Sequence, residues 1–230
     1  MKKDVSATQT SMEKQQLTQY LTPGEFMNSD HPDVIKYARA NAGDSTDLQE
    51  KAKRLYLAVR DGFRYDAYQL DFSKKAMQAS DLLQRDYGYC VEKSNLFAAC
   101  CRAEGIPARL GFANVRNHLG TEKLEKKLKT DVLVFHGYAE VYLDGKWIKA
   151  TPVFNKELCD KLGVAALDFD GENDNIFQAH SKTGNLFMEY LHDYGVFADV
   201  PYELFMSELR KHYAHLTTEI MDLQQINIRS

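Results

Sequence analysis

Two residues of the 230-residue chain, Cys90 and His136, have the side chains and surroundings that nucleophilic chemistry requires. Gly88 interrupts the preceding segment, and a run of good helix formers begins at or near Cys90. A cysteine at a helix N-terminus meets unpaired backbone N–H groups and the positive end of the helix dipole. Both favour the thiolate, so we expect a lowered pKa for Cys90, and the same N–H groups could bind an oxyanion. The alternative interpretation is a buried structural thiol, because free cysteine is commonly a core residue.

The residues after Cys90 predict a short helix that is buried on most sides. Its apolar positions recur at helical spacing on one face: Leu96, Ala99, Cys100 and Ala103. Gly105 stands where a left-handed C-cap belongs, and Pro107 prevents the helix from continuing. The sequence therefore predicts one cysteine-bearing helix from about residue 90 to residue 104.

His136 belongs to a predicted β-hairpin. Strict apolar alternation runs over residues 133–143, Asp144-Gly145 is a two-residue turn signal, and residues 147–151 form the return strand. The register of a two-residue turn places Thr151 diagonally beside His136, within side-chain reach. Asn155 follows four residues later and could approach the imidazole from its other side.

Composition limits the class of protein. The chain is 44% hydrophobic and 27% charged, so it can bury a core, and its net charge of −4 argues against nucleic-acid binding or binding to an anionic membrane. The N-terminal lysines precede no apolar segment, so we expect no signal peptide. The four cysteines have neither metal-site nor disulfide spacing. We therefore predict a cytoplasmic protein with no metal ion and no cofactor.

The chain divides into three predicted parts. Residues 1–23 are a polar N-terminal arm, and residues 24–200 form the core that contains Cys90 and His136. Residues 201–230 read as a C-terminal helical extension of the same domain, because Asp199-Val200-Pro201 resembles an N-cap and first turn.

Two motifs of this chain resemble those of the transglutaminase-like superfamily. Residues 88–97, GYCVEKSNLF, with residues 105–109, GIPAR, are similar to its cysteine block, and residues 136–148, HGYAEVYLDGKWI, are similar to its histidine block. The resemblance covers about residues 50–155. It implies a papain-like α+β fold, in which a cysteine-bearing helix packs on an antiparallel sheet with flanking N- and C-terminal helices. It also implies that Cys90 is the nucleophile and His136 the base.

The third catalytic position departs from the family pattern. The family usually places an aspartate before the proline that ends the return strand, and here Thr151 precedes Pro152. Threonine can accept a hydrogen bond but cannot stabilise an imidazolium as a carboxylate does. Asn155 could orient the imidazole instead, as in Cys-His-Asn proteases, or the pair works unaided, or activity is lost. Gln84, six residues before Cys90, is a candidate oxyanion donor, and an exposed helix residue is the alternative interpretation.

The expected activity is that of a thiol-dependent amide or ester hydrolase or acyl transferase that forms a thioester on Cys90. We expect a peptide or protein amide substrate. One alternative is an acyltransferase similar to the arylamine N-acetyltransferases, whose R-G-G-x-C-F-E-x-N block resembles residues 85–95. Another is a peptide-binding module without catalysis. The sequence specifies neither the substrate nor the oligomeric state.

Overall fold

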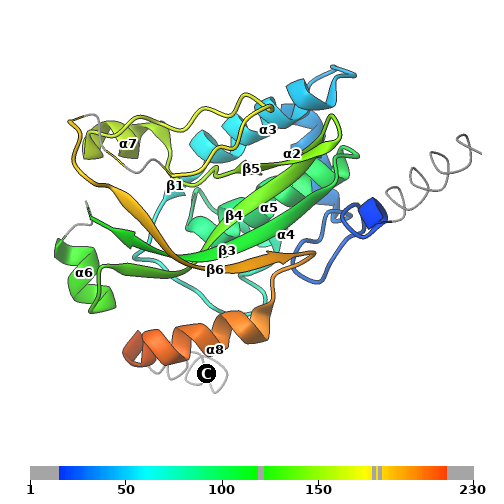
Figure 1. Ribbon diagram of the computed structural model, residues 1–230. Helices are drawn as coiled ribbons and strands as arrows, with labels where there is room; N and C mark the ends of the chain where they lie inside the picture. Colours follow the sequence, from blue (N-terminus) through cyan, green and yellow to red (C-terminus); the bar gives the residue numbers. More distant parts are fainter. Residues whose placement is uncertain (1–15, 119–121, 178–179, 181–182, 217–230) are drawn as a thin grey trace, which may run out of the picture.

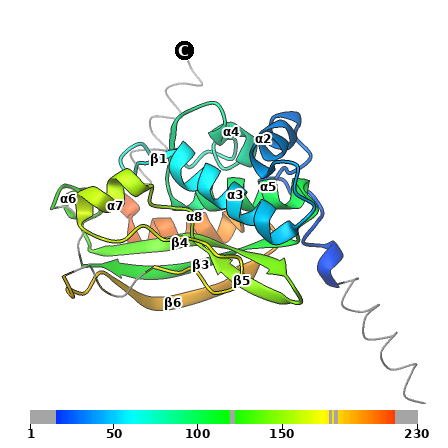
Figure 2. The same cartoon turned by 90° about the horizontal axis from the view of Figure 1, so that it is seen from above.

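A four-stranded antiparallel sheet with strand order β5-β4-β3-β6 forms the centre of the protein (Figure 1). The structure is a computed structural model that describes residues 16–118, 122–177, 180 and 183–216. The helices α2, α3, α4 and α5 lie together on one side of the sheet (Figure 2). The α+β fold predicted from the sequence is confirmed.

The helices and strands have the following bounds: α2 Pro32–Ala42, α3 Leu48–Gly62, β1 Arg64–Tyr65, α4 Ala79–Leu82, β2 Tyr87–Gly88, α5 Cys90–Ala103, β3 Ala108–Asn117, α6 Glu122–Leu128, β4 Val132–Leu143, β5 Lys146–Ala150, α7 Lys156–Leu162, β6 Met188–Phe197 and α8 Tyr202–His212. Besides the main sheet, β1 and β2 form a short parallel pair.

The helix α5 begins at Cys90, as predicted. Glu92 closes its first turn, since one carboxylate oxygen accepts the Tyr89 backbone N–H at 3.0 Å. Gly105, with φ of 78°, follows its C-terminal end in a left-handed conformation. All residues from Cys90 to Arg102 are buried, because helices and strands surround α5. This element is therefore the core of the domain and positions the cysteine.

The β4–β5 hairpin has the predicted register. Glu140 pairs with Lys149 and Tyr142 pairs with Trp147. Both turn residues have positive φ, 48° at Asp144 and 84° at Gly145, as a type I′ turn requires. Regular pairing ends at Ala150, so Thr151 lies just past the strand.

A bulge in β4 directly precedes His136 and breaks the strict alternation predicted for residues 133–143. Two residues of β4, Val134 and Phe135, stand opposite the single residue Asn114 of β3. Phe135 adopts a left-handed φ of 58°, which is unfavourable for a bulky side chain. The side chain of Asn114 accepts the Phe135 N–H at 2.9 Å, and the hydroxyl of Tyr213 accepts the Val134 N–H at 2.8 Å.

The C-terminal helix α8 thereby holds the strand that carries His136. Tyr213, the residue that follows α8, also donates its hydroxyl to the Val132 carbonyl at 2.5 Å. Of the three predicted parts, the arm lies largely outside the described residues, and the extension lies partly outside them.

Candidate active site

The residue after His136 lies directly against the first turn of α5. A Cβ atom on Gly137 would come within 3.0 Å of the Val91 Cα atom, so only a residue without a side chain allows this approach at no cost. The hydroxyl of Ser94 donates to the Gly137 carbonyl at 3.1 Å and fixes the strand to the helix. The backbone beside His136 is thus placed next to Cys90.

Cys90 is buried, with 7% of its surface exposed. Burial raises the pKa of its thiol to about 12, although the nearby backbone N–H groups of Gly137 and Val91 favour the thiolate. The expectation of a lowered pKa is therefore wrong for this buried site. The thiolate loses its hydration when it is buried, and this cost in free energy is larger than the stabilisation that the helix N-terminus and its N–H groups provide.

His136 is completely buried as well. Its ring centre lies 4.6 Å from that of Phe177, and neither ring nitrogen has a hydrogen-bond partner among the described residues. Burial lowers the pKa of this imidazole to about 3. Cys90 and His136 are therefore both neutral near pH 7, as a thiol and an imidazole.

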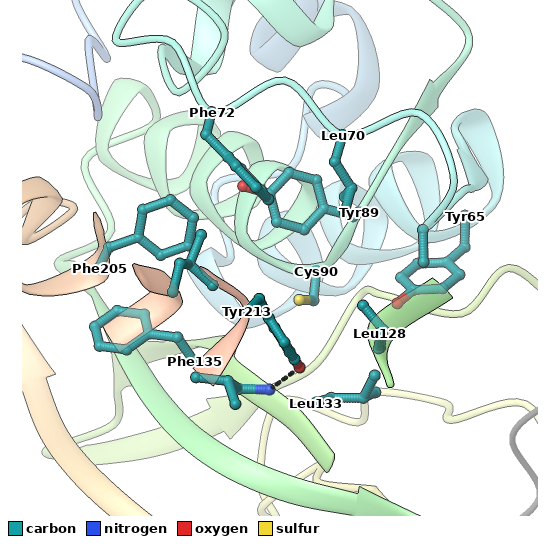
Figure 3. A pocket seen from close by; sticks show the side chains of 13 residues that line it. Tyr65, Leu70, Phe72, Tyr89, Cys90, Leu128, Leu133, Phe135, Phe205 and Tyr213 are labelled. Atoms are coloured by element: carbon teal, nitrogen blue, oxygen red, sulfur yellow. Dashed lines mark hydrogen bonds between the residues drawn. The ribbon is translucent and has the colours of Figure 1, made fainter. Parts of the chain in front are cut away.

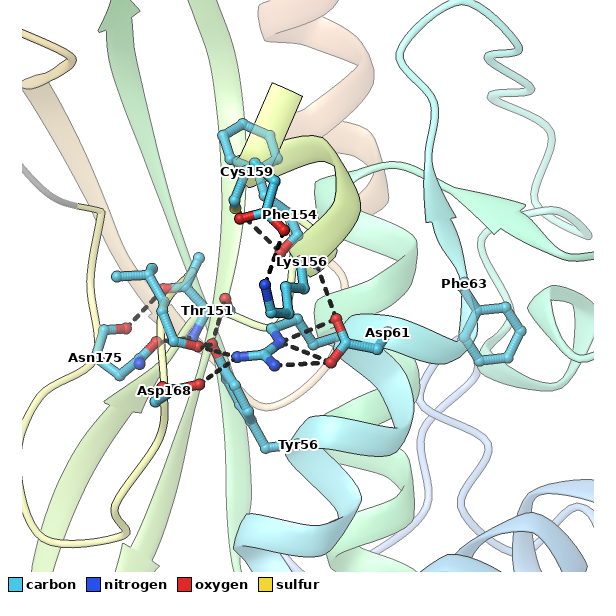
Figure 4. Close-up of polar contacts among 12 residues, drawn as sticks. Tyr56, Asp61, Phe63, Thr151, Phe154, Lys156, Cys159, Asp168 and Asn175 are labelled. Atoms are coloured by element: carbon cyan, nitrogen blue, oxygen red, sulfur yellow. Dashed lines mark hydrogen bonds and ion pairs between the residues drawn. The ribbon is translucent and has the colours of Figure 1, made fainter. Parts of the chain in front are cut away.

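Neither candidate for the third position hydrogen-bonds His136 in the structure. The Thr151 hydroxyl donates to the Asn175 carbonyl at 2.8 Å, and the Thr151 N–H donates to the Asn175 side-chain oxygen at 3.2 Å (Figure 4). The Asn155 side chain accepts the Tyr65 N–H at 3.1 Å. Both side chains bind backbone groups of other segments, and their roles in orienting the imidazole remain predictions.

Gln84 is exposed, and its amide lies 3.5 Å from a carboxylate oxygen of Asp33. Its role as an oxyanion donor has no support from this geometry. The N–H groups of Val91 and Gly137, which lie near the sulfur, are in a better position to bind an oxyanion.

The segment that carries Phe177 is fastened to α3 by two side chains. The Tyr56 hydroxyl lies 2.9 Å from the Leu167 carbonyl and 3.1 Å from the Asn175 side-chain oxygen. Arg60 donates to the Leu167 carbonyl and to Asp168, each at 2.7 Å (Figure 4). These contacts fix the residues that precede Phe177 and so keep its ring over the imidazole.

A cavity of about 50 Å³ adjoins Cys90, and thirteen residues line it (Figure 3). They come from β4, from α8 with Tyr213, from Leu128 of α6, from β1 and the chain between β1 and α4, and from the start of α5 with Tyr89. Sequence reasoning missed this cavity and the cover over His136. Only Gly137 carried a signal, since a glycine within a strand pattern indicates close backbone approach.

The transglutaminase-like superfamily model matches residues 35–152, about half of the chain. The chain belongs to the transglutaminase-like superfamily. The matched region includes Cys90 and His136 and ends before β6 and α8, so these two elements lie outside the part shared with the superfamily.

Two solved structures are similar to this superfamily member. A proposed cysteine protease from Cytophaga hutchinsonii has a TM-score of 0.47 and 23% identity, over 60% of this chain and 42% of that chain. A proposed protease from Parabacteroides distasonis has a TM-score of 0.37 and 16% identity, over 55% of this chain and 26% of that chain. The chain thus spans less than half the length of either protein. No curated protein matches it.

All four cysteines are free thiols. In the described part of the chain, no group of three or more His, Cys, Asp or Glu side chains is arranged to bind a metal ion. None of the helices described is long and apolar enough to cross a bilayer.

Because the ring nitrogens of His136 are buried without hydrogen-bond partners in the part of the chain that the structure describes, we expect this residue to lower the free energy of unfolding. We expect His136→Leu to raise the free energy of unfolding at pH 7 by about 1–3 kcal/mol, because the desolvated polar atoms are removed. Between pH 6.5 and pH 3, the unfolded chain protonates this histidine and the folded chain does not. Titration of His136 therefore lowers the free energy of unfolding of the wild type by up to about 1.4 kcal/mol for each pH unit of acidification in this range. The His136→Leu variant lacks this pH-dependent contribution.

Denaturant unfolding from pH 4 to pH 8 measures both effects. The exposed His192 provides the matched control, since His192→Leu removes a histidine from the surface and keeps the buried imidazole of His136. Lower stability of His136→Leu at pH 7 would show that the imidazole nitrogens are paired in solution.

The Asn175 contacts predict that this residue keeps His136 covered. Asn175→Ala removes the acceptor for the Thr151 N–H and one of the acceptors of the Tyr56 hydroxyl. We expect it to destabilise the fold by about 1–3 kcal/mol and to raise the pKa of His136 toward 6.5, because water reaches the imidazole once Phe177 is released. An NMR titration of the histidine Cε1–H signals measures the pKa.

Asn173→Ala is the control for this experiment. Asn173 lies on the same segment, is exposed and binds Asp170 through its side chain. An unchanged His136 pKa in Asn175→Ala, or an equal shift in Asn173→Ala, would contradict the assigned role of Asn175.

Proposed function

We propose that the protein is a thiol-dependent hydrolase or acyl transferase that acts on amides or esters, with Cys90 as nucleophile and His136 as base. The observation that carries this proposal is the close packing of Gly137, the residue after His136, on the first turn of α5, where the Ser94 hydroxyl donates to the Gly137 carbonyl at 3.1 Å. Membership of the transglutaminase-like superfamily supports the same pairing.

The neutral state of both groups defines the chemistry of the first step. As the Cys90 sulfur attacks the substrate carbonyl carbon, the thiol proton passes to one imidazole nitrogen of His136. The carbonyl oxygen gains the negative charge, and the N–H groups that surround the sulfur are suitably placed to stabilise it. The imidazolium then protonates the leaving amine or alcohol as its bond to the carbonyl carbon breaks, which leaves a thioester on Cys90.

The second step releases the acyl group. Water, or an amine in the transfer reaction, attacks the thioester carbonyl and gives its proton to His136. Cleavage of the carbon–sulfur bond returns the proton to Cys90, so that the starting thiol and imidazole are restored. Because His136 is completely buried, the ring of Phe177 has to move away before substrate reaches the pair.

An uncharged residue at the third catalytic position is compatible with a Cys90 thiol and a His136 imidazole that are both neutral before the reaction. A carboxylate beside His136 would favour imidazolium, whereas the buried imidazole here has a pKa near 3. Thr151 and Asn155 then act on the imidazole through the segments that they hold. The proposed substrate is a peptide or protein amide.

The test is hydrolysis of p-nitrophenyl acetate by the full chain and by variants of each group. We expect Cys90→Ala to abolish turnover and His136→Gln to slow it by about 10²–10⁴-fold, the usual contribution of a general base. Cys101→Ala is the control, since Cys101 is a buried thiol of the same helix. An added primary amine separates the two reactions, because an acyl transferase forms the amide at the expense of acetate.

Turnover that survives in Cys90→Ala would overturn the proposal. So would equal losses in Cys90→Ala and Cys101→Ala, since the effect would then report packing of α5.

A further inference from the structure

We infer that the cavity beside Cys90 binds a short, uncharged aliphatic acyl group of the substrate, and that α8 supplies the wall that limits its length. The inference rests on the proposed function, because it assigns the substrate class of the same site. It concerns the group attached to the carbonyl that Cys90 attacks.

The lining of the cavity excludes charged groups. None of its thirteen residues is charged, and most of them are aliphatic or aromatic. The Tyr213 hydroxyl is occupied by the Val134 N–H and the Val132 carbonyl, and the Tyr89 hydroxyl lies 3.5 Å from the sulfur of Met77. A carboxylate or ammonium group placed here would lose its hydration without gaining a charged partner. An apolar group instead gains by leaving water.

The size of the cavity indicates a short chain. Its volume of about 50 Å³ exceeds the ~10–15 Å³ that a single water requires, and it is well below the ~150 Å³ of an engineered cavity that binds benzene. A chain of about four carbons fits this range, whereas an aromatic ring or a long acyl chain requires the walls to move.

Helix α8 closes one side of this cavity with Phe205 and Leu209, and Tyr213 extends the same wall. Phe205 stacks edge-on against Phe72, with ring centres 5.7 Å apart, and contacts Phe135 at 5.6 Å. These contacts join α8 to two other walls of the cavity. Since α8 lies outside the region matched by the superfamily, this wall is a feature of this chain beyond the shared catalytic unit.

The experiment measures acylation of the full-length protein by p-nitrophenyl acetate, butyrate and octanoate, each rate divided by that of N-acetylcysteine with the same ester. Each methylene group that enters the cavity should raise the rate by about fourfold. Butyrate carries two more methylene groups than acetate, so we expect it to react about sixteenfold faster on this scale, and octanoate to gain nothing beyond butyrate.

Variants of Leu209 test the wall in both directions. Leu209→Ala should move the preference to octanoate, and Leu209→Phe should lower butyrate relative to acetate, with circular dichroism to show that each variant is folded. Leu204 lies on the same helix with 38% of its surface exposed and does not line the cavity. Leu204→Ala is therefore the matched control and should keep the wild-type preference.

The outcomes separate this inference from the proposed function. Equal relative rates for the three esters, with acylation still on Cys90, would overturn the acyl cavity and leave the hydrolase proposal intact. An equal shift of the ester preference in Leu204→Ala and Leu209→Ala would also overturn the acyl cavity and leave the hydrolase proposal intact. If no ester acylates Cys90, the proposed function fails and the inference fails with it.

Discussion

The close contact between β4 and the first turn of α5 is the constraint on which the rest of the site depends. Gly137 allows the strand to approach the Val91 Cα atom, and Ser94 fastens the Gly137 carbonyl to the helix. As a consequence the start of α5 and the backbone beside His136 pack together in the interior of the domain. The bulge at Val134 and Phe135, held by side chains from β3 and from the end of α8, supports this arrangement on the other side of the histidine.

Burial of this contact determines the electrostatics of the pair. Desolvation raises the pKa of the thiol and lowers that of the imidazole, so both groups are uncharged in the interior of the domain near pH 7. The residue that takes the family's acidic position, Thr151, binds Asn175 instead. Asn175 in turn holds the segment that ends in Phe177 above the imidazole. Hydrogen bonds in this fold therefore keep His136 covered, whereas a carboxylate at the position of Thr151 would favour the imidazolium.

Local patterns in the sequence predicted the elements of the site but not its environment. The start of α5 at Cys90 and the register of the hairpin followed from Gly88, Gly105 and the Asp144-Gly145 turn, because each acts over a few residues. The bulge before His136 could not be predicted, since its Val134 N–H binds a tyrosine almost eighty residues away and its Phe135 N–H binds Asn114 of β3. Phe177 likewise reaches His136 through tertiary packing alone, and the resulting desolvation reversed the expected pKa of Cys90.

The most direct test of the central claim is to locate the acyl group after a brief reaction with an activated ester. The full-length protein and its His136→Gln variant are quenched in acid, digested and mapped by mass spectrometry. The account predicts one acyl group on the peptide that contains Cys90, with none detectable on Cys100, Cys101 or Cys159, and a much slower appearance in the variant. Acylation at another residue, or the same rate on Cys90 in both proteins, would contradict it.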